Sequence, residues 1–172
     1  FIRHCKANKS DLKVVDSAKT SLTGGKLLAG ALAFRRVLER EVLSKDEKTI
    51  GLLVPPSVGG ALANMAVALN GRVSVNLNYT LSEDVLNYCV KKAGIKHVLT
   101  SRKFLEKKPY NLEGAEFVFL EDLKEKITGK DKAMAALGAF AMPAKMLERV
   151  LGLHKIDPHE TLTIVFTSGS TG

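Results

Sequence analysis

Hydroxyl side chains and glycines are closely spaced in the last six residues, Thr167, Ser168, Gly169, Ser170, Thr171 and Gly172. Small residues let a backbone turn sharply and approach a ligand closely. Consecutive backbone N–H groups in such a turn form a concave nest for an anion, and the hydroxyls add further donors. Because the apolar run Leu162–Phe166 directly precedes them, we predict a strand followed by a loop that cradles nucleotide phosphates. An ordinary polar turn is the alternative that these residue types leave open.

Ionisable side chains elsewhere form no comparably specific pattern. His97 lies within an apolar run, and a single histidine in a strand is typical of a structural role. His154 and His159 flank Asp157, but Pro158 interrupts a regular ligand spacing and no cysteine joins them. A metal site there is therefore the weaker interpretation, and we expect no metal ligands in this sequence.

The segment 130–153 combines basic residues with apolar residues at spacings of three and four. Its apolar members are Met134, Leu137, Phe140, Ala144, Leu147 and Leu151. Pro143 interrupts the pattern, so we expect two short helices or one kinked helix. One interpretation is a helix packed on the core. The other is a surface element that contacts a membrane or a lipid-like substrate, flanked by Lys130, Lys132, Lys145, Arg149 and Lys155.

The remaining sequence predicts the elements that would position the loop. Strands at 12–15 and 20–22 precede an amphipathic helix over 24–43. Residues 50–100 then alternate between strands and helices, at 50–54, 58–69, 73–77, 82–93 and 95–100. A helical turn at 101–106 and strands at 115–120 and 161–166 follow. Apolar strands joined by short connections are typical of right-handed βαβ crossovers. We therefore predict an α/β fold with a mostly parallel sheet flanked by helices.

Composition excludes several classes of protein. A length of 172 residues, with 45% hydrophobic and 26% charged residues, is typical of one soluble globular domain. Cys5 and Cys89 can build neither a disulfide framework nor a structural zinc site, which favours a reducing compartment. No uninterrupted apolar run reaches the roughly 18 residues of a membrane span.

The net charge of +8 is spread evenly along the chain. Residues 1–86 carry 12 basic and 8 acidic side chains, and residues 87–172 carry 14 and 10. No zinc finger and no cluster of RNA-stacking aromatic residues accompanies this charge. We therefore predict no nucleic-acid partner.

The run TIVFTSGSTG resembles the phosphate-binding signature of the adenylate-forming, AMP-binding superfamily, which usually reads TSGSTGxPKG. Thr167–Gly172 match its first six positions. Upstream, SLTGGKLLAGALAFRRVL from Ser21 and IGLLVPPSVGGALANMAVALNGRVSVNLN from Ile50 agree with the family in order and spacing. The resemblance covers about residues 12–172. The sequence departs from the family at Tyr79, where proline often follows the Leu-Asn pair.

The resemblance implies that residues 1–172 are the N-terminal part of an adenylation domain, incomplete at the C-terminal end. In this family a carboxylate, here a fatty acid, attacks the α-phosphate of ATP bound with Mg²⁺, and the thiol of coenzyme A or acyl carrier protein then accepts the acyl group. The segment 130–153 is similar to an amphipathic helical insert of acyl-acyl-carrier-protein synthetases. Thr167–Gly172 would bind the β- and γ-phosphates, while the family's catalytic residues lie downstream of Gly172.

Two further expectations and one alternative remain, and the membrane contact among them rests on the apolar pattern and the flanking basic residues of 130–153. These 172 residues alone would catalyse nothing. The protein would be cytoplasmic, with peripheral contact at the inner face of a membrane through residues 130–153. The alternative is a non-catalytic α/β binding or regulatory module derived from the same fold.

Overall fold

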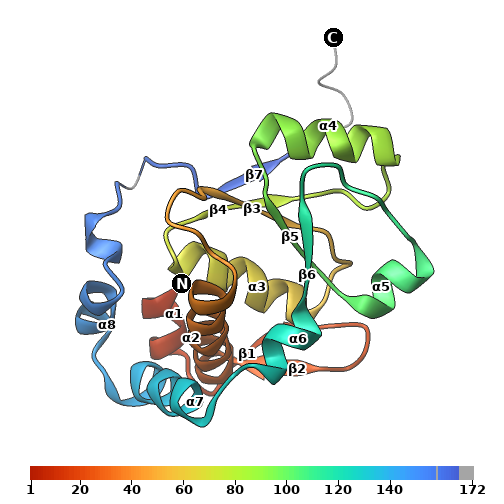
Figure 1. The fold of residues 1–172 in the computed structure, drawn as a ribbon. Coiled ribbons are helices and arrows are strands. Elements are labelled where there is room, and N and C mark those ends of the chain that lie inside the picture. The colour runs from red at the N-terminus through yellow and green to blue at the C-terminus, as the bar shows by residue number, and fades with distance from the viewer. Residues whose placement is uncertain (158, 167–172) are drawn as a thin grey trace.

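A five-stranded parallel sheet forms the centre of the molecule (Figure 1). The computed structural model describes residues 1–157 and 159–166. The strands are β3 (Thr49–Leu52), β4 (Val73–Asn76), β5 (His97–Thr100), β6 (Glu116–Phe119) and β7 (Thr163–Val165). They lie in the order β6-β5-β3-β4-β7, and each neighbouring pair is parallel. The predicted α/β class and parallel sheet are confirmed.

Helices cover both faces of this sheet. One face carries α2 (Gly24–Glu41), α3 (Val58–Leu69) and α6 (Leu120–Glu125), and the other carries α4 (Glu83–Ala93) and α5 (Arg102–Lys107). Ile50, Leu52 and Leu99 pack against the first group. Leu53 and Val75 pack against the second. Because β3 is covered on both faces, its continuous apolar run is explained.

The N-terminal region packs outside the main sheet. A separate antiparallel pair, β1 (Leu12–Val15) and β2 (Ser21–Thr23), follows α1 (Ile2–Ala7) in the chain and lies beside α2 and α3. Helix α2 begins where the chain passes very close to α1, since a Cβ on Gly24 would lie 2.3 Å from the carbonyl oxygen of Asn8. A side chain at this position would therefore push the two elements apart.

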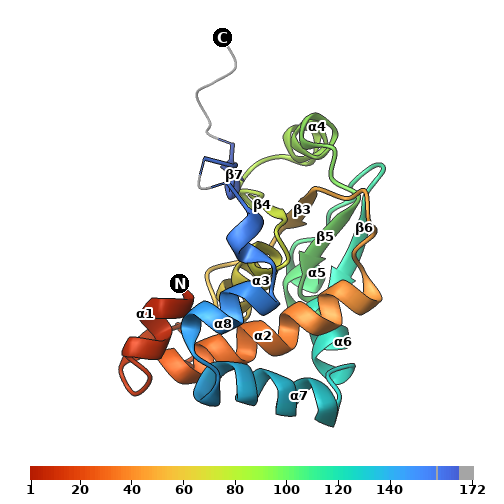
Figure 2. The ribbon, with the colours of Figure 1, turned by 90° about the vertical axis from the view of Figure 1, so that its left-hand side faces the viewer.

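Short helices from the segment after α6 lie beside α2 (Figure 2). They are α7 (Gly129–Ala136), the π-helical turn η1 (Leu137–Ala141), α8 (Ala144–Val150) and the 3-10 turn η2 (Leu153–Lys155). The predicted division into two short helices near Pro143 is confirmed. A single apolar stripe is wrong, because the wider π-helical turn and Pro143 change the helical phase between α7 and α8. Leu147 is buried, whereas Met134 and Leu137 are exposed.

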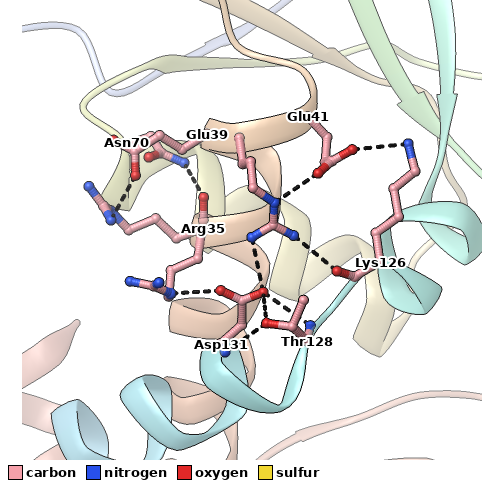
Figure 3. A network of polar contacts seen from close by, with 9 residues as sticks. Arg35, Glu39, Glu41, Asn70, Lys126, Thr128 and Asp131 are labelled. Carbon is pink, nitrogen blue, oxygen red and sulfur yellow. Dashed lines mark hydrogen bonds and ion pairs between the residues drawn. The ribbon is translucent and has the colours of Figure 1, made fainter.

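Buried Asp131 fastens α7 to α2 (Figure 3). Its carboxylate accepts hydrogen bonds from Arg36 Nε at 2.8 Å and Arg40 Nη1 at 3.0 Å. It also closes a capping box with Thr128 at the start of α7. Burial alone would raise the pKa of Asp131, but the hydrogen bonds from Arg36, Thr128 and Arg40 hold that pKa well below its usual range.

A second set of contacts joins α2 to α3. Arg35 Nε donates to the carbonyl oxygen of Leu69. The amide of Asn70 donates to the carbonyl oxygen of Arg35 (Figure 3). These contacts hold the C-terminal end of α3 against the middle of α2. Within residues 1–157 and 159–166, no helix combines the length and the apolar character that crossing a membrane requires.

Candidate functional site

A cleft of about 800 Å³ opens at the carboxyl edge of β3 and β4. The strand β3 continues into α3 on one face, whereas β4 continues into α4 on the other face. The two connections therefore leave neighbouring strand ends in opposite directions. Open α/β sheets bind ligands in the crevice formed at such a point. The topology thus makes this cleft the candidate binding site.

The cleft is lined by both polar and apolar residues. Hydroxyl and amide groups come from Ser57, Asn64, Asn76 and Asn78, and Asp16 contributes a carboxylate. The apolar residues are Val14, Val15, Leu52, Val54, Pro55, Pro56, Ala61, Leu77 and Tyr79. None of the described residues lining the cleft is a lysine or an arginine. A polyanion bound here therefore needs donors from another segment.

Two asparagines in the lining of the cleft join α3, β4 and β7. The amide of Asn64 donates to Asn76 Oδ1 at 3.0 Å, and the amide of Asn76 donates back to Asn64 Oδ1 at 3.1 Å. Asn76 Nδ2 also donates to Thr163 Oγ1 at 3.2 Å, and Thr163 Oγ1 donates to the carbonyl oxygen of Ser74 at 2.9 Å. These bonds add to the backbone pairing of Ser74–Asn76 with Thr163–Val165. These side-chain and backbone hydrogen bonds therefore fix β7 relative to the cleft.

The hairpin β1–β2 is tied to the same edge through the start of α3. Asp16 Oδ2 accepts a hydrogen bond from the backbone N–H of Val58 at 3.2 Å, and Asp16 Oδ1 accepts one from Thr20 at 2.9 Å. These backbone donors, Val58 foremost, lower the pKa of Asp16. Ser57 Oγ accepts the N–H of Gly60 at 3.1 Å and caps α3. The N-terminal end of α3 is thus held from two sides.

Replacing Ser57 by alanine should lower the free energy of unfolding by about 1 kcal/mol, because the cap on α3 is lost. Ser82 is a matched control. It occupies the N-cap position of α4, but its side chain accepts no capping hydrogen bond. Ser82→Ala should therefore change stability much less. Urea unfolding of both variants measures the difference, and equal losses would contradict the capping role of Ser57.

The Tyr79 side of the cleft is braced by residues distant in sequence. Lys108 Nζ and Tyr110 Oη both donate to the carbonyl oxygen of Tyr79. The ring of Tyr79 meets the ring of Phe104 edge-on, with 5.7 Å between centroids. The loop after β4 is therefore held at Tyr79 by hydrogen bonds to its backbone carbonyl and by packing of its ring.

The residues expected to bind phosphate, Thr167–Gly172, lie outside the described residues. The strand that leads into them is described: β7 pairs with β4, and its last residue, Val165, is in register with Asn76. The predicted order of an apolar strand and then the hydroxyl-rich segment is thus present up to Phe166. The chain reaches this segment from the same sheet edge as the cleft.

The other candidates have structural explanations. His97 Nδ1 contacts both carboxylate oxygens of buried Glu47 at 2.9 Å, which supports its predicted structural role. Within the described ranges, no group of three or more His, Cys, Asp or Glu side chains could hold a metal ion. Cys5 and Cys89 are buried, and burial raises the pKa of both thiols, so neither is an activated nucleophile.

Sequence reasoning missed most of the cleft. No role in the site is predicted from the sequence for Ser57, Asn64 or Asn76. A usable signal existed, because polar residues within and just after a predicted parallel strand lie at the sheet edge where ligands bind. Asn76 and Asn78 satisfy that description. Asp16 gave no such signal, because its hairpin is brought to α3 only by tertiary packing.

Comparison with solved structures finds a similar fold in other proteins. O-succinylbenzoate coenzyme A synthetase from Bacillus subtilis, in complex with AMP, matches 99% of this chain with a TM-score of 0.73 and 19% identity. The N-terminal subdomain of NpsA from Klebsiella oxytoca matches 74% of it with a TM-score of 0.64 and 14% identity. The chain spans only 39% of the first protein and 32% of the second. These likenesses show the fold.

A family model supplies the classification that structural likeness at this level of identity does not. The model described as AMP-binding enzyme matches residues 1–172, the whole of the sequence. The matched range includes the strand β7 and the hydroxyl-rich segment after it. The chain therefore belongs to the AMP-binding enzyme family.

Proposed function

We propose that the chain is the N-terminal part of an ATP-dependent acid–thiol ligase, and that Thr167–Gly172 bind the β- and γ-phosphates of ATP. The observation that carries the proposal is the placement of β7. This strand is fixed to the cleft by Asn76 and Thr163, and the chain continues from it into the segment rich in hydroxyls and backbone N–H groups. Such a segment stabilises phosphate charge by hydrogen bonding rather than by covalent chemistry.

The chemistry of the cleft supports different roles for its described lining and for Thr167–Gly172. The described lining carries amides, hydroxyls and one carboxylate, but no lysine or arginine. It therefore suits the uncharged and apolar parts of a substrate, and the phosphate contacts are left to Thr167–Gly172. The described residues also hold no cluster of carboxylates for Mg²⁺. We propose that Mg²⁺, which neutralises phosphate charge in such reactions, is bound by residues outside the described part of the chain.

We further propose a fatty acid as the carboxylate and coenzyme A or acyl carrier protein as the thiol acceptor. The support is the resemblance of the segment 130–153 to acyl-acyl-carrier-protein synthetases. The structurally similar proteins act on other acids: one is named for O-succinylbenzoate, and NpsA was solved with 3-hydroxybenzoyl-AMSN. The acid is therefore the part of the proposal that an experiment should address first.

ATP–pyrophosphate exchange on the longer native ligase, with fatty acids of graded chain length, tests the proposal. Exchange that depends on one acid would establish adenylation and identify the substrate. Gly169→Val should lower the exchange rate by at least about a hundredfold, because an added side chain blocks close approach of the backbone to phosphate. Gly129→Val, at the start of α7 where an added Cβ meets no atom within 4 Å, is the control outside the cleft. Absence of exchange with every acid, from folded protein, would favour the non-catalytic module.

A further inference from the structure

A group of exposed apolar side chains lies along α7, η1 and α8. Met134 and Leu137 are 45% and 48% exposed, and Met146 and Val150 are 54% and 65% exposed. Met134, Leu137 and Val150 line one groove of about 240 Å³, so these three face one another although α7 and α8 are separate helices. Met146 lies one turn before Val150 on the same side of α8. We call these four residues the apolar surface.

Phe140 does not belong to the apolar surface, although it is half-exposed. A Cβ added to Gly25 would lie 2.6 Å from the ring of Phe140, so the ring covers the beginning of α2. Leu147 and Ala139 are buried against α1 and α2. The segment thus divides its apolar residues between the core and the solvent. The core interpretation of the sequence pattern therefore holds for one set of residues, while a second set is exposed.

The charged side chains around the apolar surface are unbalanced. The two carboxylates of the segment are paired with arginines from other elements: Asp131 with Arg36 and Arg40, and Glu148 with Arg3. The segment's own cations are exposed, and none forms an ion pair with a described carboxylate; they are Lys130, Lys132, Lys145, Arg149 and Lys155. The segment therefore presents uncompensated positive charge.

Two of these cations border the apolar surface directly. Lys130 lies one turn before Met134 on α7, and Arg149 lies three residues after Met146 on α8. Arg36 lines the groove itself. Apolar side chains surrounded by basic ones are thus present on a surface built from two helices rather than on one continuous stripe.

The backbone beneath this surface is firmly held. Lys6 Nζ donates to the carbonyl oxygens of Gly138, Ala139 and Met142 at 2.6 to 3.0 Å, at the C-terminal end of η1, where carbonyl groups lack partners within the helix. The capping box at Thr128 begins α7, and Pro143 precedes α8. The apolar surface therefore exists before any partner binds.

We propose that the apolar surface and its border of basic residues bind the surface of an anionic phospholipid bilayer. Hydrocarbon would receive Met134, Leu137, Met146 and Val150, while lipid phosphates would lie beside Lys130 and Arg149. A symmetric contact between two copies of this chain would instead place like charges against each other. The proposal goes beyond the ligase function and does not depend on it.

Co-sedimentation with vesicles tests the proposal without any activity assay. The longer native ligase should bind mixed phosphatidylglycerol–phosphatidylcholine vesicles at low salt, and bind pure phosphatidylcholine vesicles much less. Met146→Ser combined with Val150→Ser, and separately Lys130→Glu combined with Arg149→Glu, should each weaken partitioning by roughly tenfold. Raised salt should weaken binding of the wild type, because screening reduces attraction to the anionic surface.

Helix α4 offers a matched control on the opposite face of the sheet. It exposes Val85 and Tyr88 at 42% and 55%, close to Lys91 and Lys92. Val85→Ser with Tyr88→Ser, and Lys91→Glu with Lys92→Glu, should leave partitioning unchanged. Circular dichroism and thermal unfolding show that every variant is folded.

Three results would overturn the proposal. The first is no binding of the wild type to anionic vesicles at low salt. The second is equal losses in the α4 variants and in those of α7 and α8. The third is concentration-dependent self-association, or capture by an acidic carrier protein, that Lys130→Glu with Arg149→Glu abolishes while vesicle binding persists.

Discussion

Replacing Asp131 by alanine is expected to lower the free energy of unfolding by about 3 kcal/mol, the largest single effect in the α2–α7 contact. The substitution removes the acceptor of Arg36 and Arg40 and also opens the capping box with Thr128. Removing one partner of a buried ion pair costs more than the pair contributes, because the other charges lose their compensation. Both arginines retain partial exposure, with 33% and 42% of their side chains accessible, so we expect the lower end of the usual range.

Asp122 is the matched control for this measurement. Its carboxylate pairs with Arg102 at 2.6 Å, but both side chains are exposed. Exposed ion pairs contribute little, so Asp122→Ala should change urea unfolding only slightly. Similar losses in the two variants would contradict the special role of Asp131.

The same carboxylate makes stability depend on pH in a defined direction. Asp131 stays ionised in the folded chain at a pH where the unfolded chain, with an ordinary aspartate pKa of about 3.9, already takes up a proton. Its contribution is therefore complete above about pH 5 and is lost as the pH falls toward the lowered pKa of the folded state. Asp131→Asn should flatten this part of the stability profile below pH 5. An unchanged profile in Asp131→Asn would show that other groups cause the acid loss.

Periodicity predicted the central elements well, for a physical reason. β3 is apolar because helices cover both of its faces. Helix α3 is preceded by Ser57 and followed by Asn70 and Gly71, whose types favour helix boundaries. These signals are local in sequence. By contrast, α1 and α6 each have six residues, too few for a helical period to show. They are helical because α2 and the sheet supply the packing.

The candidate site also has one part that the sequence predicts and one part that depends on contacts between distant residues. The hydroxyl-rich segment is recognisable from six adjacent residues, and the family model confirms the family that it indicated. The cleft is assembled from the hairpin, the start of α3 and the loop after β4. Asp16 and Val58 are 42 positions apart in sequence, and Asn76 and Thr163 are 87 apart. Contacts at such separations leave no periodic trace in a single sequence.

Asn76→Ala is expected to release β7 from the cleft edge. The two side-chain amide N–H groups of Asn76 donate to Asn64 Oδ1 and Thr163 Oγ1, so one substitution removes the side-chain link from α3 to β7. Within the described residues, β7 pairs with β4 alone, at three positions. Amide hydrogen exchange at Ile164 and Val165 should therefore become faster while exchange in β3 and β5 is unchanged.

The same substitution should lower ATP–pyrophosphate exchange by about a hundredfold in the longer native ligase, since displacement of a binding group by about 1 Å has effects of this size. Thr163→Val keeps the β-branched shape and removes only the hydroxyl, so it should produce a smaller loss in the same direction. Asn87→Ala is the control: its amide bonds to Asn111 on the α4 side of the sheet. Faster amide exchange in β7 without loss of activity would separate the strand from phosphate binding. Unchanged amide exchange would contradict the role of Asn76, because β7 would then be held by backbone pairing alone.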